Sequence, residues 1–312
     1  MRPFFACALL FALPPIALAQ NAAPPVCGDP PALLRSTQPN IFSEEQEQWL
    51  GDAEADVIER ELKPVKDEKQ NAYLDAIGKR LLAVLPPTRL QFHFLLIDSS
   101  EVNGFSLAGG RVYITRKLVA NAQSEDELAG VIAHELGHIL THQFAYEITA
   151  AMKKLLGVTS VGDRADVYAK FQKLMDAAMR DKHGFGGAGE DEKQDEADRI
   201  AIYATAAAGY RPQAFAEFWD RSFFVGGKTG NGFTDFMGLT KPGEKRLRLI
   251  RKMAADLPST CVRGGAELEH LKLGSAVRFA ALQNDGAQLT VLTADQKVRR
   301  FDVRSKPQVA EK

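Results

Sequence analysis

The sequence predicts an α+β fold that is mainly helical, with a small sheet and a short β-rich segment at the C-terminal end. Three observations support this prediction. Most of the stretch 43–256 carries apolar residues at helical spacing, in segments that prolines and glycines separate. Two runs rich in aromatic and aliphatic residues, LQFHFLLID and RVYIT, interrupt this pattern between residues 90 and 115. After Cys261 the residues alternate in the way that is typical of strands.

Length and charge restrict the class of protein. The chain has 312 residues, of which 45% are hydrophobic, so it can form one substantial domain with an appendage. The formal net charge is -1, and the basic residues are scattered along the chain. We therefore expect no nucleic-acid partner and no attraction to an anionic membrane.

The first 19 residues are typical of a signal peptide. An arginine precedes an apolar run that ends in Ala17-Leu18-Ala19, a small-x-small cleavage pattern. A membrane anchor is the alternative, but Pro14-Pro15 breaks the run, and no later segment reaches the ~18 apolar residues of a spanning helix. We expect a bacterial periplasmic or secreted protein without stable membrane insertion, in which residues 20–42 form a proline-rich linker or arm.

Cysteine usage agrees with export. Cys7 leaves with the signal peptide, so that Cys27 and Cys261 remain. In an oxidising compartment these two predict one disulfide, with two unpaired thiols as the alternative. We expect a domain over residues 43–261, followed by a hairpin segment and tail over residues 262–312.

The elements follow in order along the chain. Ser43 is the expected N-cap of a first helix that Pro64 ends, and Pro86-Pro87 end a second. The two apolar runs then form strands joined by a turn. Ser124 and Glu127 form a capping-box pattern that begins the next helix at the serine. Further helices are expected at about 144–156, 163–182, 192–208, 213–225 and 243–256, and NDG at 284–286 predicts a hairpin.

The helix that begins at Ser124 carries the motif HELGH. His134 and His138 lie four residues apart, so they share one helix face and can present two imidazole nitrogens to one metal ion. Glu135 lies beside them, where it can take a proton from water and pass it to a leaving amine. The alternative is an amphipathic helix that carries two histidines by chance. His142, one turn later, fits a supporting or surface role better than that of a ligand.

With GGRVYIT before it, DEADRIAIYATAAAGYRPQAF after it and KPGEKRLRLI later, HELGH resembles peptidase family M48, over about residues 44–256. The resemblance implies a zincin-like endopeptidase with one Zn²⁺ per chain, held by His134 and His138, with Glu135 as general base. It implies that Asp198 orients a ligand histidine. It also implies that the active helix lies beneath an edge strand, Arg111–Thr115, and that Arg111, Val112 and Tyr113 pair with substrate.

The third metal ligand departs from the family pattern. The family has a glutamate four residues before the aspartate, and this chain has Gln194 there. Glu192 and Glu196 stand nearby, but at ~100° per residue Glu196 points to the face opposite Gln194. Either Gln194 or Glu196 then completes the site. A glutamine oxygen brings no charge, so we expect weaker metal binding if Gln194 does so.

A second departure is Lys241-Pro242, where the family often has His-Pro. A lysine at this place can stabilise a developing oxyanion, or it can be a solvated residue at a helix entry. The leading hypothesis is a zinc metalloendopeptidase that cleaves unfolded or misassembled envelope proteins, which are its expected polypeptide substrates and partners. The alternative is a weakly active or non-catalytic protein that binds client polypeptides, since Gln194 replaces the expected ligand.

Overall fold

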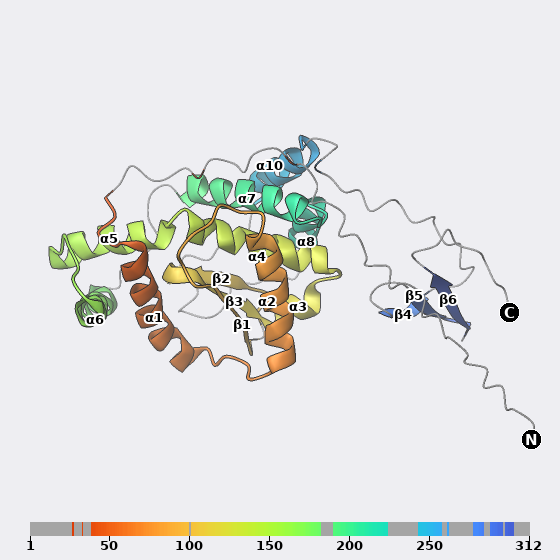
Figure 1. Cartoon of the computed structure of the whole chain (residues 1–312), viewed down its shortest axis with the longest axis horizontal. Coiled ribbons are helices and arrows are strands. Elements are labelled where there is room, and N and C mark those ends of the chain that lie inside the picture. The colour runs from red at the N-terminus through yellow and green to blue at the C-terminus, as the bar shows by residue number, and fades with distance from the viewer. Residues whose placement is uncertain are drawn as a thin grey trace, which may run out of the picture.

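A computed structural model describes residues 27, 33, 39–99, 101–181, 190–223, 243–257, 261, 277–283, 288–295 and 297–302. In this part of the chain helices predominate, and two small sheets accompany them, as the sequence predicts (Figure 1). The mainly helical α+β class is confirmed. Among the described helices, none is both long and apolar enough to cross a membrane.

Helix α1 begins where the sequence predicts, and the first two helices end three to four residues before the prolines that were expected to end them. Helix α1 (Glu44–Glu61) has Ser43 as N-cap, and a complete capping box joins Ser43 to Gln46. Helix α2 (Glu68–Leu82) begins at Asp67, whose carboxylate accepts two main-chain N–H groups of the first turn. The prediction of Ser43 as N-cap is therefore confirmed.

The main sheet has three strands in the order β1-β3-β2. Strand β1 (His93–Ile97) is parallel to β3 (Arg111–Thr115), and β2 (Gly104–Leu107) is antiparallel to it. The prediction that Arg111, Val112 and Tyr113 lie on an edge strand is therefore wrong, because β3 pairs on both sides. The sequence reads as a turn before Arg111, but residues 104–107 form a strand that takes the edge position.

A tight reversal makes this pairing possible. The 3-10 turn η1 (Ala108–Gly110) joins β2 to β3, with φ of 70° at Gly109 and 105° at Gly110. Residues that carry a side chain rarely adopt such φ angles, and a Cβ on Gly109 would lie 2.6 Å from the α1 backbone at Gln48. The two glycines therefore allow the chain to fold back beside α1.

Helix α4 (Glu125–Leu140) carries HELGH and packs on one face of the sheet, while α1 packs on the other. Ser124 is its N-cap, as predicted. The reciprocal half of the predicted capping box differs, since the Glu127 carboxylate accepts the N–H of Gln123 rather than that of Ser124. Glu127 also binds Arg221, which holds the helix start to α8 (Gln213–Phe223).

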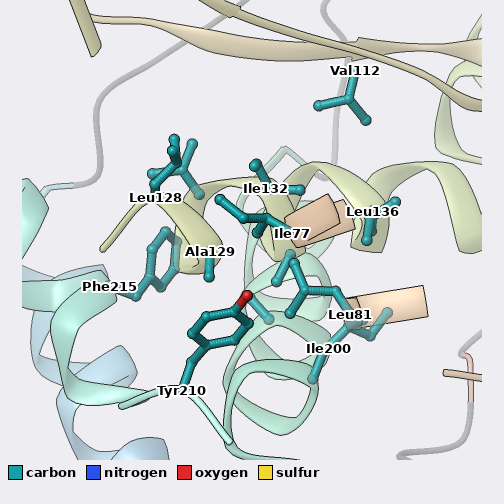
Figure 2. Close-up of a cluster of buried hydrophobic side chains, with 14 of the residues drawn as sticks. Ile77, Leu81, Val112, Leu128, Ala129, Ile132, Leu136, Ile200, Tyr210 and Phe215 are labelled. Carbon is teal, nitrogen blue, oxygen red and sulfur yellow. The ribbon is translucent and has the colours of Figure 1, made fainter. Parts of the chain in front are cut away.

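The other helices enclose α4. They are α3 (Arg116–Asn121), α5 (Gln143–Leu156), α6 (Arg164–Asp181), α7 (Glu190–Ala207) and α10 (Glu244–Ala255). Helix α7 covers the side of α4 that faces away from the sheet (Figure 1). The core between these layers is formed by aliphatic and aromatic side chains of α2, α4, α7 and α8, with Val112 from the sheet (Figure 2).

Helices α4 and α7 approach each other closely at one point. A Cβ on Gly137 would lie 2.7 Å from the Cα of Ala197 and 2.9 Å from its carbonyl oxygen. Real Cβ atoms do not approach backbone so closely, so the glycine within HELGH permits this packing. The register between the two helices is thereby fixed next to His134 and His138.

The C-terminal segment forms a second antiparallel sheet, with β4 (Val277–Gln283), β5 (Gln288–Thr293) and β6 (Val298–Asp302). It lies apart from the helical body (Figure 1). The predicted hairpin corresponds to β4 and β5, while its NDG turn lies outside the described residues, and the third strand was not predicted. The structure joins Cys27 and Cys261 in a disulfide, with an S–S distance of 2.13 Å.

One buried carboxyl couples folding to pH. Glu54 of α1 is 4% exposed and accepts the N–H of Ala108 at the start of η1. Burial raises the pKa of Glu54 to about 8, and the nearby Glu147 contributes in the same direction. The folded state therefore favours the protonated form of this group.

We expect stability to fall as pH rises through this window. Since the folded pKa of Glu54 lies above its unfolded value of 4.5, its contribution is complete below pH 4.5 and is lost as pH rises to about 8. At about 1.4 kcal/mol per pKa unit, the loss amounts to a few kcal/mol. Glu54→Gln removes the titration and retains an acceptor for Ala108. In thermal unfolding, the variant should match the unmodified chain at pH 5 and exceed it at pH 8.

The exposed Glu61 on the same helix supplies the control. Glu61→Gln should leave the dependence of the melting temperature on pH unchanged. A Glu54→Gln curve parallel to that of the unmodified chain at every pH would contradict the role assigned to Glu54.

Candidate metal centre

His134 and His138 face each other at the centre of the molecule. Both lie on α4, with 5% and 8% of their surfaces exposed, and their Nε2 atoms are 3.0 Å apart. The rings meet edge to face, and the Phe215 ring lies against that of His134. The spacing of four residues therefore brings the two imidazole nitrogens together, as the sequence predicts.

The ion pair of Asp198 and Arg246 orients the ring of His134 from its Nδ1 side. Its Nδ1 lies 2.9 Å from Oδ1 of Asp198, which comes from α7 and is fully buried. Arg246 of α10 binds the same carboxylate with two hydrogen bonds, of 2.6 Å and 2.7 Å. Burial alone would raise the pKa of Asp198, but the hydrogen bonds from Arg246 and His134 outweigh it and hold the pKa below its usual value. An ionised Asp198 then accepts the Nδ1–H of His134.

A neutral side chain holds His138. Its Nδ1 lies 2.5 Å from Oε1 of Gln143, and Nε2 of Gln143 donates to the carbonyl oxygen of Lys193 on α7. Because that carbonyl can only accept, the amide nitrogen must face it, and the amide oxygen must face the histidine. His138 is therefore the donor at Nδ1.

The short turn after α4 brings Gln143 to this position. His142 has the left-handed conformation with φ of 57°, which is uncommon for a residue other than glycine. Its Nδ1 lies 2.7 Å from the buried carboxylate of Glu47 on α1. That contact offsets the strain, of the order of 1–2 kcal/mol, and lets α5 begin at Gln143, beside His138. His142 thus has the supporting role that the sequence suggests.

These hydrogen bonds determine which ring nitrogens carry protons. With Nδ1 of His134 paired to Asp198 and Nδ1 of His138 paired to Gln143, the two Nε2 atoms face each other across 3.0 Å. Burial, assisted by the neighbouring His134, lowers the pKa of His138 to about 3, so this ring is neutral at physiological pH. When both rings are neutral, the facing Nε2 lone pairs repel each other unless a cation lies between them. Two nitrogens at ~2.0–2.1 Å from one zinc ion would lie on the order of 3.3 Å apart, so the pair fits a divalent metal.

The sequence predicts a third metal ligand on α7, either Gln194 or Glu196. Within the described ranges, no third His, Cys, Asp or Glu joins the two histidines in a metal-binding group. Glu196 instead receives hydrogen bonds from the guanidinium group of Arg199, and it lies on another face of α7, two residues before Asp198. This pairing and position disfavour Glu196 as the third ligand, and the choice between Glu196 and Gln194 stays a prediction. Gln194 lies one turn before Asp198 on the same face, and Glu192 is exposed.

Glu135 is buried beside His134 and contacts the sheet. Its Oε2 accepts a hydrogen bond of 2.8 Å from the hydroxyl of Ser106 on β2. Burial raises the pKa of Glu135, while His134 and the hydroxyl of Ser106 act in the opposite direction. The carboxyl group is thus placed where it can exchange a proton with a group bound between the histidines and β2.

Lys241, predicted as a catalytic residue, lies outside the described residues. The structure brings together His134, Glu135, His138 and Asp198, and it adds Ser106 and Gln143, which sequence reasoning missed. No local signal marks these two, because Gln143 depends on the unusual turn at His142 and Ser106 on strand pairing. Arg246, which lies within KPGEKRLRLI, pairs with the carboxylate of Asp198.

Comparisons with known proteins agree with this arrangement. The family model described as Peptidase family M48 matches residues 68–256, so α1 lies outside the matched range. The beta-barrel assembly-enhancing protease of Yersinia pestis is 28% identical over 187 residues, which cover 57% of this chain and 37% of that protein. The protein of the same name from Escherichia coli K12 is 27% identical over 182 residues, with 56% and 37% covered.

A eukaryotic protein is also similar. The mitochondrial metalloendopeptidase OMA1 of Schizosaccharomyces pombe is 25% identical over 198 residues, which cover 61% of this chain and 54% of that protein. The matched part of the present chain thus spans little more than a third of the two bacterial relatives and about half of the yeast one. The range that the family model matches, residues 68–256, contains the histidine pair and the three-stranded main sheet.

The neutral acceptor at His138 can be tested by metal binding. Gln143→Met keeps the length of the side chain and removes both of its hydrogen bonds, so His138 is no longer fixed in ring orientation and tautomer. We expect zinc affinity to fall about 10- to 100-fold, measured by competition with a chromophoric chelator. Thr149→Val is the control. Thr149 is also buried on α5, but its hydroxyl accepts the N–H of Ile41 in the N-terminal arm, so this change should leave zinc affinity unaltered. Equal zinc affinity in Gln143→Met and the unmodified chain would refute this role.

Proposed function

The chain belongs to peptidase family M48, and from that premise we propose that it is a zinc-dependent metalloendopeptidase. One observation carries the proposal: two buried imidazoles face each other through their Nε2 atoms, 3.0 Å apart, with the carboxyl group of Glu135 beside them. The names of the relatives, which include proteases and metalloendopeptidases, support it. We assign the peptidase domain to residues 43–261 and treat residues 262–312 as a separate C-terminal segment.

In this proposal His134 and His138 hold one zinc ion, with the amide oxygen of Gln194 as third ligand. When bound, zinc acts as a Lewis acid toward a peptide carbonyl and makes water more acidic. Glu135 takes a proton from the attacking water at one carboxylate oxygen and passes it to the nitrogen of the leaving amine. Asp198 and Gln143 keep the two rings in the tautomer that presents Nε2. Lys241 is assigned to stabilising negative charge on the carbonyl oxygen.

The substrate class is an extended polypeptide that pairs with β2. The Asn103 carbonyl accepts the N–H of Thr115, so by antiparallel alternation the main-chain groups of Gly104 and Ser106 face away from β3. These groups can add a substrate strand by main-chain hydrogen bonds, which gives loose sequence preference. Because all four β2 residues are buried, the atoms that cover this edge must move before a substrate can bind.

We further propose that the substrates are unfolded or misassembled envelope proteins, met in the periplasm after removal of residues 1–19. Support comes from the signal-peptide pattern and from the beta-barrel assembly-enhancing proteases among the relatives. The second candidate function is a client-binding protein with little or no proteolytic activity. It is favoured by Gln194, which brings no negative charge to the metal.

Loss of the proposed base tests the proteolytic function. Glu135→Gln should retain zinc and reduce cleavage of an unfolded casein substrate by roughly 10²- to 10⁴-fold, because the amide cannot take a proton. Treatment of the unmodified chain with a chelator should abolish cleavage, and added zinc should restore it. Equal cleavage by Glu135→Gln and the unmodified chain would exclude the mechanism, and absence of cleavage by both would favour the client-binding function.

The third ligand can be tested by restoring a carboxylate. Gln194→Glu adds a negative charge to a donor set of two neutral imidazoles, so zinc affinity should rise by at least tenfold. The measurement is competition with a chelator, and proteolysis at limiting zinc should rise with it. Glu192 is exposed and lies about half a helical turn from position 194 on α7, so Glu192→Gln should alter neither zinc affinity nor proteolysis. If Gln194→Glu leaves zinc affinity unchanged, position 194 is not at the metal.

A further inference from the structure

Ser106 is the polar residue that the sheet presents to Glu135. It lies on β2, is 1% exposed, and its hydroxyl donates to Oε2 of Glu135 over 2.8 Å. The side chains of Phe105 and Leu107 pack with α1 on the opposite face of the sheet, as strand alternation requires. Gly104 faces α4, and a Cβ there would lie 3.1 Å from Val131. A single hydroxyl therefore reaches across the interface between β2 and α4.

This hydrogen bond makes the two oxygens of Glu135 unequal. A carboxylate accepts hydrogen bonds but does not donate, so the hydroxyl proton of Ser106 must point to Oε2. Rotation about the carboxylate bond would break the contact, and both groups are shielded from water, which makes an unpaired oxygen or hydroxyl costly. The contact thus holds Glu135 in one rotamer and leaves Oε1 free to exchange a proton.

We propose that Ser106 is a positioning residue for Glu135. Its hydroxyl fixes Oε2 of Glu135, so that Oε1 of the same carboxylate acts as the proton acceptor. This inference rests on the proposed function. Ser106 acts through Glu135 by its side chain, while its main-chain groups face the outer edge of β2, where a substrate strand would pair. Ser106 would thus contact the general base through its side chain and the substrate through its main chain. These two contacts from one residue set the position of Glu135 relative to the scissile bond.

The two roles of Ser106 predict a specific kinetic pattern. Ser106→Ala removes the hydroxyl but retains the main-chain N–H and carbonyl that would bind substrate. The value of kcat should fall roughly 10- to 100-fold because the base is no longer held in line, while KM should stay within about twofold. Zinc content should remain that of the unmodified chain, since no ligand nitrogen is touched.

Two further variants make the test specific. Ser106→Cys preserves the size of the side chain but has a weak donor, so its kcat should lie between those of serine and alanine. Thr205→Val removes another buried hydroxyl, whose hydrogen bonds stay within α7, and should leave kcat and KM unchanged. A fall in kcat that only follows a loss of zinc or of folded protein, or an unchanged kcat in Ser106→Ala, would overturn the proposal.

A readout without metal separates this inference from the proposed function. In a crystal structure of metal-free Ser106→Ala, the Glu135 carboxylate should leave the position seen with Ser106 or occupy more than one rotamer. An unmoved carboxylate would overturn the inference even if the unmodified chain proves to be an active zinc peptidase. Absence of zinc-dependent cleavage by the unmodified chain would instead overturn the proposed function, whatever the rotamer of Glu135.

Discussion

The site depends on the close approach of α4 and α7 at Gly137 and Ala197. The absence of a side chain at Gly137 lets the two backbones come within contact distance. At one end of this contact Asp198 reaches His134, and at the other the carbonyl oxygen of Lys193 reaches Gln143, which in turn holds His138. A wider spacing between the helices would break both connections together, and both imidazoles would lose their orientation.

The two histidines are supported unequally, and the difference concerns charge. Asp198 is ionised, and the cation of Arg246 balances its charge. Gln143 adds none at His138. A dication binds His134 and His138 only as neutral rings, and the amide of Gln194 carries no charge. Glu135 is the remaining carboxyl group beside the rings, and burial raises its pKa. Its ionised form would be favoured by a cation bound between the two rings.

Local sequence signals predicted the parts of the fold that local chemistry decides. Ser43, Ser124 and the spacing of the histidines each follow from interactions within one helix turn. The helical period also places Glu196 away from Gln194, which agrees with its pairing to Arg199. What could not be predicted depends on distant contacts. Residues 104–107 form a strand because they pair with β3, and Gln143 reaches His138 because His142 adopts a left-handed conformation.

Helix α10 links the metal centre to the disulfide. Its N-cap, Gly243, has no side-chain cap, so the helix is held by packing of Leu247, Ile250 and Ala254 and by the ion pair of Arg251 with Asp220. Cys261, shortly after α10, is bonded to Cys27, 234 residues earlier. In the loop-closure model a bridge of this length disfavours the unfolded chain by about 5 kcal/mol. Since α10 supplies Arg246, which neutralises Asp198, oxidation of the two cysteines stabilises the same folded state in which His134 is correctly oriented.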